Sequence, residues 1–142
     1  MMKFNARNID TSTLLPRAKK EAKAIFKSDS SRRGRTYKKI LEDTLYGHVS
    51  ELYLIQEHQF KDDPKSFKDL FDPEGNAVEV KTTQFKHYVP SVLDRAADVK
   101  KNQIWRNFPD ILYVFVGDKN TLEYNLDGIY KWGRTKYVLQ NV

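Results

Sequence analysis

Asp69, Glu79 and Lys81 are the residues whose types and spacing could support hydrolysis of a phosphodiester. That reaction needs a divalent ion to neutralise developing charge, a source of hydroxide, and a cation near the scissile phosphate. Residues two apart in a strand project from the same face, so Glu79 and Lys81 are expected to point the same way. Asp69 and Glu79 would hold Mg²⁺ or Mn²⁺, with the backbone carbonyl of Val80 as a third ligand. Lys81 would orient the attacking water.

The segment 66–83 has the pattern of a β-hairpin that would bring these groups together. Residues 72–76 combine proline and glycine in a turn. Residues 77–83 alternate with period two and are rich in β-branched side chains. With the turn at about 73–76, Asp69 would lie opposite residues near 79 and 80. Asp72 competes with Asp69 as metal ligand, but its place beside a proline favours a role in capping the turn.

Hydrophobic periodicity predicts the elements around the hairpin. We expect a helix over 14–26 and a second from about Tyr37 to His58. The apolar stripe of the second is Ile40, Leu41, Leu45, Val49, Leu52 and Ile55. Pro90 and Ser91 would open a third helix, with Ser91 and Asp94 at capping-box spacing. It would end near 107–109, and its apolar face is Val92, Leu93, Ala96 and Val99.

The remaining segments suggest strands and an arm. The continuous apolar run 111–116 is typical of a buried central strand. The helix between this run and the Glu79 strand makes a βαβ unit, which predicts that the two strands are parallel. Residues 122–139 predict one or two further edge strands. Residues 1–12 are polar and predict a loosely held arm.

Composition and charge limit the classes of protein to which this chain can belong. The chain has 142 residues, of which 39% are hydrophobic and 31% charged, which is the balance of one ordinary globular domain. Cysteine is absent, which excludes disulfides and thiolate metal sites. No apolar leader and no stretch of about 18 apolar residues is found. We therefore expect a cytoplasmic protein, for example in a bacterial or phage-infected cell, with no membrane partner.

Positive charge is concentrated near the N-terminus. Between Arg17 and Lys39 there are ten positive residues against Glu21 and Asp29, a balance of +8, so the rest of the chain sums to −2 of the net +6. Such a block favours binding of a polyanion through release of counterions. The alternative is a solvated basic face that binds nothing. The candidate nucleic-acid-binding residues are Lys19, Lys20, Lys23, Arg32, Arg33, Arg35, Lys38 and Lys39.

The sequence resembles the PD-(D/E)XK, or restriction-endonuclease-like, nuclease superfamily. The residues that carry the resemblance are those at 68–72, Gly75 and 78–83, together with 47–51 upstream. The resemblance implies an α/β fold with an α-β-β-β-α-β core, a mixed sheet flanked by helices, and a further acidic residue at Glu51. It implies one nuclease domain over 1–142, in which 1–45 is a basic helical extension and 46–142 the catalytic core. The sequence departs from the pattern before Asp69, where the superfamily's proline is absent.

Acidic-x-Lys occurs four times in the chain, at 21–23, 63–65, 79–81 and 98–100, so the tripeptide alone is weak evidence. Only 79–81 lies in a β-branched strand that follows an aspartate and a glycine turn. Glu79 and Lys81 could still be the solvent face of a strand whose valines point inward. Glu51 would point either along the sheet edge or into water. Gln84 is a possible accessory contact to phosphate or water.

The function that these residues predict is Mg²⁺-dependent DNA endonuclease activity on duplex or branched DNA, leaving a 5′-phosphate as the resemblance suggests. Cleavage of both strands would favour a homodimer or tetramer, because one copy has one site. A Holliday-junction resolvase is the close alternative. Two alternatives are not enzymes. One is a non-catalytic DNA-binding module on the same fold, and the other is a structural component that uses only its charge.

Overall fold

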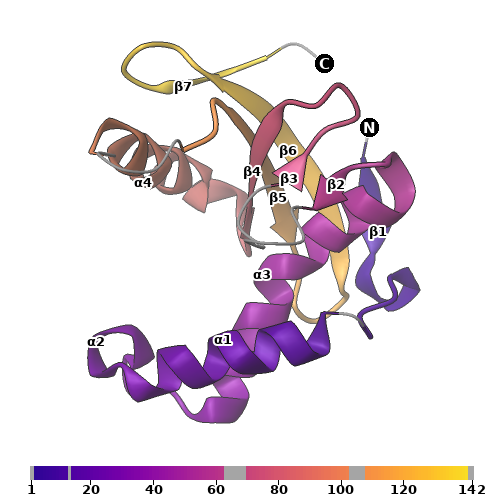
Figure 1. Ribbon diagram of the computed structural model, residues 1–142, viewed down its shortest axis with the longest axis vertical. Coiled ribbons are helices and arrows are strands. Elements are labelled where there is room, and N and C mark those ends of the chain that lie inside the picture. Colours follow the sequence, from indigo (N-terminus) through magenta and orange to yellow (C-terminus); the bar gives the residue numbers. More distant parts are fainter. Residues whose placement is uncertain (1, 13, 63–69, 103–107, 141–142) are drawn as a thin grey trace.

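A mixed β-sheet covered by helices makes up the computed structural model, which describes residues 2–12, 14–62, 70–102 and 108–140 (Figure 1). No helix in these ranges has the length and apolar character to cross a membrane. The elements in chain order are β1 (Lys3–Asn5), η1 (Ala6–Asn8), α1 (Leu15–Lys27), α2 (Asp29–Arg32), α3 (Tyr37–His58), β2 (Lys61–Asp62), β3 (Leu70–Phe71), β4 (Ala77–Thr83), η2 (Lys86–Tyr88), α4 (Val89–Lys101), β5 (Ile111–Gly117), β6 (Glu123–Trp132) and β7 (Tyr137–Leu139).

Strands in the described ranges are ordered β1-β6-β5-β4-β3-β2, and β7 also pairs with β6. β3 and β4 form the predicted antiparallel hairpin, with Leu70 opposite Val78. β4 and β5 are parallel, as the βαβ pattern predicts. The prediction of one or two edge strands in residues 122–139 was wrong for β6, whereas β7 pairs with β6 alone in the described ranges. β6 lies inside the sheet because it pairs with β5 on one side and with β1 and β7 on the other.

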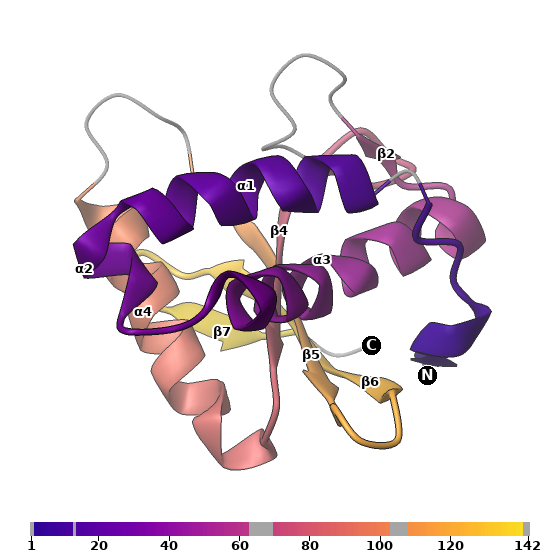
Figure 2. The same ribbon diagram turned by 90° about the horizontal axis from the view of Figure 1, so that it is seen from below.

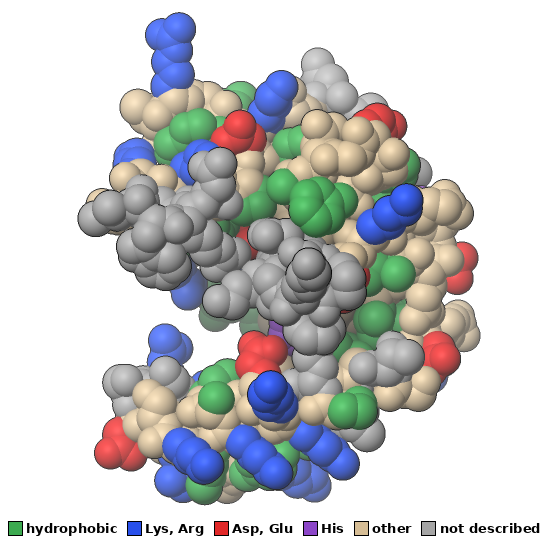
Figure 3. Space-filling model, viewed as in Figure 1, with side chains coloured by type: hydrophobic (Ala, Val, Ile, Leu, Met, Phe, Trp, Pro, Cys, Tyr) green, Lys and Arg blue, Asp and Glu red, His purple; other side chains and the backbone are tan. Residues whose placement is uncertain are grey.

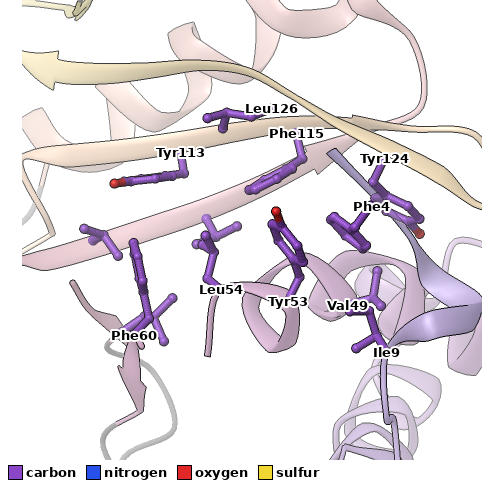
Figure 4. Close-up of a cluster of buried hydrophobic side chains, with 13 residues drawn as sticks. Phe4, Ile9, Val49, Tyr53, Leu54, Phe60, Tyr113, Phe115, Tyr124 and Leu126 are labelled. Carbon is purple, nitrogen blue, oxygen red and sulfur yellow. The ribbon is translucent and has the colours of Figure 1, made fainter. Parts of the chain in front are cut away.

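The apolar run of β5 is explained by helices on both faces of the sheet. Its side chains alternate between two cores: Tyr113 and Phe115 pack with α3, whereas Leu112 and Val114 pack with α4. A strand covered on both faces needs apolar residues at every position. Figure 4 shows the α3 side of the core, in which Tyr53 and Leu54 of α3 face the aromatic residues of the sheet.

The N-terminal segment is part of this core, so the prediction of a loosely held arm was wrong. β1 pairs with β6, and the ring of Phe4 is 8% exposed. That ring stacks on Tyr53 with centroids 4.1 Å apart and on Tyr124 with centroids 4.9 Å apart. Ile9 is buried in the same core, and Met2 and Ala6 pack against it, so several apolar side chains besides Phe4 fix the segment.

α1 and α3 begin and end within a residue of the predicted bounds, and α1 lies alongside α3 (Figure 2). The boundary expected between residues 45 and 46 falls inside α3. Leu52 and Ile55 of the predicted stripe are half-buried and pack against the core, but the stripe was wrong for Leu41 and Leu45, which are half-buried and belong to neither core. α3 packs against both the sheet and α1, so its buried surface is broader than one stripe. The buried residues of α3 are Ile40, Thr44, Val49, Ser50, Tyr53 and Leu54.

α4 begins earlier than its sequence suggests. Its N-cap residue is Tyr88, and Pro90 lies in the first turn, so Ser91 and Asp94 do not form a capping box. Pro is tolerated in a first turn because its missing N–H has no helical partner there. Val99 was expected in the apolar face but is 49% exposed, because α4 packs through Val89, Ala96 and Ala97.

Candidate functional site

A cavity of about 340 Å³ lies between α1, α3 and β4, and every described residue that was predicted to be catalytic or to bind metal lines it. Glu51 of α3 lines it together with Glu79, Val80 and Lys81 of β4. Figure 3 shows the molecule hollowed on this side, between the layer that contains α1 and α2 and the rest of the fold. The cavity is also lined by Glu21, Ile25, Arg35, Asp43, Thr44, Gly47, His48 and Thr82.

Glu79 and Lys81 are brought together by strand geometry, as the two-residue spacing predicts. Lys81 Nζ lies 3.8 Å from Glu79 Oε1. The Glu79 side chain is 16% exposed, whereas that of Lys81 is 46% exposed. The carboxylate is therefore set into the protein, and the ammonium group is free to reach solvent or a ligand's phosphate.

Glu51 is held in place by a residue that sequence reasoning missed. His48, one turn earlier in α3, lies 3.3 Å from Glu51 through Nδ1 and 2.8 Å from Glu21 of α1 through Nε2. Burial opposes a charge on the ring, but hydrogen bonds to Glu21 and Glu51 outweigh it and raise the pKa of His48 to about 10. Near neutral pH both ring nitrogens therefore donate to carboxylates.

The i, i+3 spacing of His48 and Glu51 was a signal in the sequence, since such residues are neighbours on a helix. Glu21 gave no such signal, because its contact with His48 depends on how α1 packs against α3.

Two features of α3 shape the wall of the cavity. Ser50 is fully buried, and its hydroxyl lies 3.0 Å from the hydroxyl of Thr82, so a hydrogen bond fastens α3 to β4 beside Lys81. Gly47 has no atom within 4 Å of the position that a Cβ would occupy. The absence of a side chain at Gly47 therefore leaves room in the cavity.

Asp69 lies outside the described residues. Its chain neighbour Leu70 pairs with Val78, the residue before Glu79. Asp72 caps the turn, as expected, because its Oδ1 accepts from the backbone N–H of Glu74 and Asn76. Gln84 follows β4 and is half-buried, and it is not among the described residues that line the cavity.

The candidate nucleic-acid-binding residues fall into two groups. Lys19, Lys20, Lys23, Arg33 and Lys38 are exposed, and Figure 3 shows Lys and Arg side chains gathered along the rim below α1. The other three have partners within the chain, which were not predicted. Arg35 and Lys39 pair with Asp43 at 2.9 and 3.2 Å. The guanidinium of Arg32 lies over the ring of Phe26, 4.0 Å from its centroid.

Asp43 is the centre of this ion-pair network, which also includes Lys119 at 3.0 Å. Burial raises the pKa of the Asp43 carboxyl, but hydrogen bonds from Lys119, Arg35 and Lys39 outweigh it, so the pKa is lowered. The network joins α3 to the turn that follows β5 and forms one end of the cavity.

The donor atoms on the cavity wall are of the kind that Mg²⁺ and Mn²⁺ prefer, because Glu51 and Glu79 offer carboxylate oxygens and Val80 a backbone carbonyl. Within the described ranges, which do not include Asp69, no three His, Asp or Glu side chains are grouped as a metal site. Comparison with protein-family models and with curated protein sequences found no match to this chain.

Proposed function

We propose that this chain is a metal-dependent DNA endonuclease whose site is the cavity between α1, α3 and β4. The observation that carries the proposal is the convergence of Glu51, Glu79 and Lys81 on one cavity from two different elements. Two carboxylates and a lysine around a hollow large enough for a phosphate group are the set that phosphodiester hydrolysis requires.

The fold supports the same reading. The order α3-β2-β3-β4-α4-β5 is the α-β-β-β-α-β order that the resemblance to the PD-(D/E)XK superfamily implies. β4 bears Glu79 and Lys81, and α3 bears Glu51, as that resemblance requires.

The roles of Glu51, Glu79, Val80 and Lys81 follow from their places on the cavity wall, and that of Asp69 from its place in the sequence. Glu79, Glu51, the carbonyl of Val80 and Asp69 would hold Mg²⁺ or Mn²⁺, which when bound supplies charge neutralisation at the scissile phosphate and a more acidic water. Lys81, whose ammonium group is the more exposed, would contact the phosphate and orient the water. His48 would keep the Glu51 carboxylate turned toward the cavity.

DNA binding is supported by the exposed lysines of α1. Lys19, Lys20 and Lys23 lie on one helix within a chain of net charge +6. Such a surface supplies a sequence-independent attraction to phosphate that weakens as salt is raised. Arg35 and Lys39 are expected to contribute less, because Asp43 neutralises part of their charge.

The test is cleavage of supercoiled plasmid by the intact chain, with Mg²⁺ or Mn²⁺ and with a chelator. Glu79→Gln, Lys81→Ala and Asp69→Asn are each expected to lower the rate of nicking at least about 100-fold, the scale of losing one group that stabilises the transition state. Glu51→Gln is expected to have a smaller effect.

Glu74→Gln and Lys101→Ala are matched controls, because both residues are exposed and lie away from the cavity. Equal nicking by the wild type and by all four site variants would refute the proposal. Salt-dependent DNA binding that is indifferent to metal and to Lys81→Ala would instead indicate a non-catalytic binding module. Preferential cleavage of a four-way junction over linear duplex would indicate a junction resolvase.

A further inference from the structure

Three aromatic rings form an exposed cluster immediately after β4. Phe85 is 46% exposed and Tyr88 is 47% exposed. The ring of His87 stacks on that of Phe85 with centroids 5.4 Å apart, and it lies 4.4 Å from that of Tyr88. The cluster occupies a short turn that includes η2, and Lys86 within it is exposed. We name Phe85, His87 and Tyr88 the aromatic turn.

The aromatic turn is not part of either core. Phe4 and Phe115, which are core residues, are 8% and 0% exposed, whereas almost half of the surface of Phe85 and of Tyr88 is in solvent. Large aromatic groups that contact one another at the surface offer flat apolar faces, and positive charge close by favours a ligand that is flat and anionic.

A second cavity lies between β4 and α4, the two elements that the aromatic turn joins. Its volume is about 400 Å³, and Lys81, Thr82 and Thr83 of β4 and Arg95 of α4 form its polar wall. Lys81 and Thr82 line both cavities, so the second cavity adjoins the same part of β4 as the proposed site. From Lys81 to Phe85 the chain spans at most about 13 Å, at roughly 3.3 Å per extended residue.

We propose that the aromatic turn binds unpaired bases of a DNA strand whose phosphates contact Lys81 and Arg95. An unpaired strand presents both a flat base face and a phosphate at every nucleotide, which matches rings next to cationic side chains. In a duplex the bases are stacked on each other and paired, so the rings have no base face to contact. The substrate of the proposed nuclease is therefore DNA with a single-stranded or branched segment.

This inference deepens the proposed function and depends on it for the identity of the substrate. Its test is a binding measurement made in a chelator, where no cleavage occurs. The binding measurement therefore tests the preference for single strands, and the plasmid assay tests the nuclease activity. Either one can fail without the other.

The test is fluorescence anisotropy of the intact chain with two labelled DNAs. One is an oligothymidine strand of about 20 nucleotides, and the other is a duplex of about 20 base pairs. Phe85→Ala and Tyr88→Ala are each expected to weaken binding of the single strand about 5- to 100-fold, the scale of losing one base–aromatic stack. Binding of the duplex is expected to change less than about twofold, because its phosphate contacts remain. Tyr88→Trp is expected to restore binding.

Leu139→Ala is the matched control, because Leu139 is an apolar residue of β7 that is 57% exposed. Circular dichroism checks that each variant is folded. Two separate alanine variants are used so that the test still holds if one of them does not fold. Unchanged single-strand binding in both variants, or an equal loss with Leu139→Ala, would overturn the proposal. The proposal would also be overturned if the two alanine variants changed the oligomeric state, measured by light scattering, but not DNA binding. The aromatic turn would then be an interface between copies of the chain.

Discussion

His48 makes the stability of this protein depend on pH in a direction that can be worked out. It lies between Glu21 of α1 and Glu51 of α3, and its pKa is raised from 6.5 to about 10. Below pH 6.5 the ring is protonated in both the folded and the unfolded chain, and the ion pairs contribute fully. Between pH 6.5 and about 10 the unfolded chain releases its proton while the folded chain still holds one. The contribution is therefore lost as pH rises.

The magnitude follows from the same shift. Each pKa unit corresponds to about 1.36 kcal/mol, so the full shift corresponds to about 5 kcal/mol. The side chain of Glu21 is 45% exposed, and solvent there screens its attraction for the ring. We expect the free energy of unfolding to fall by on the order of 2 kcal/mol across this range because of His48.

The assay is urea unfolding followed by circular dichroism at several pH values between 6 and 10, in a chelator, for the wild type and His48→Gln. The variant is expected to be less stable than the wild type by on the order of 2 kcal/mol near pH 6 and nearly equal to it near pH 10. His87→Gln is the control, because His87 is exposed and residues 84–90 contain no Asp or Glu. A difference between wild type and His48→Gln that stays constant with pH would refute the reasoning.

Three further substitutions test the packing by urea unfolding. Gly47→Ala is expected to raise the free energy of unfolding by about 0.5–1 kcal/mol, because the residue is helical and the added methyl group meets no atom within 4 Å; a loss of stability would contradict this. Gly117→Ala is expected to lower it by about 1–3 kcal/mol, since its Cβ would lie 2.5 Å from the ring of Tyr124; an unchanged midpoint would show that the ring moves without cost. Phe4→Ala is expected to lower it by about 3–5 kcal/mol, because the ring is buried between Tyr53 and Tyr124. A loss below about 1 kcal/mol would mean that β1 does not hold the core together.

Local patterns in the sequence were enough to predict most elements of this fold. The helices α1 and α3, the hairpin of β3 and β4 and the parallel pairing of β4 with β5 depend on short-range periodicity, turn residues and chain connectivity. The pairing of Glu79 with Lys81 is predictable for the same reason, because residues two apart in a strand share a face whatever surrounds them.

Only tertiary structure decided how distant segments meet. Residues 1–12 have no regular apolar pattern, yet Phe4 and Ile9 are buried in the core and β1 pairs with β6. The contact of His48 with Glu21 joins two helices, and no periodicity within either helix specifies it. The placement of Glu51, Glu79 and Lys81 around one cavity likewise requires α3 to pack against β4. Each sequence pattern fixes the face of its own element but not the neighbouring element that this face contacts.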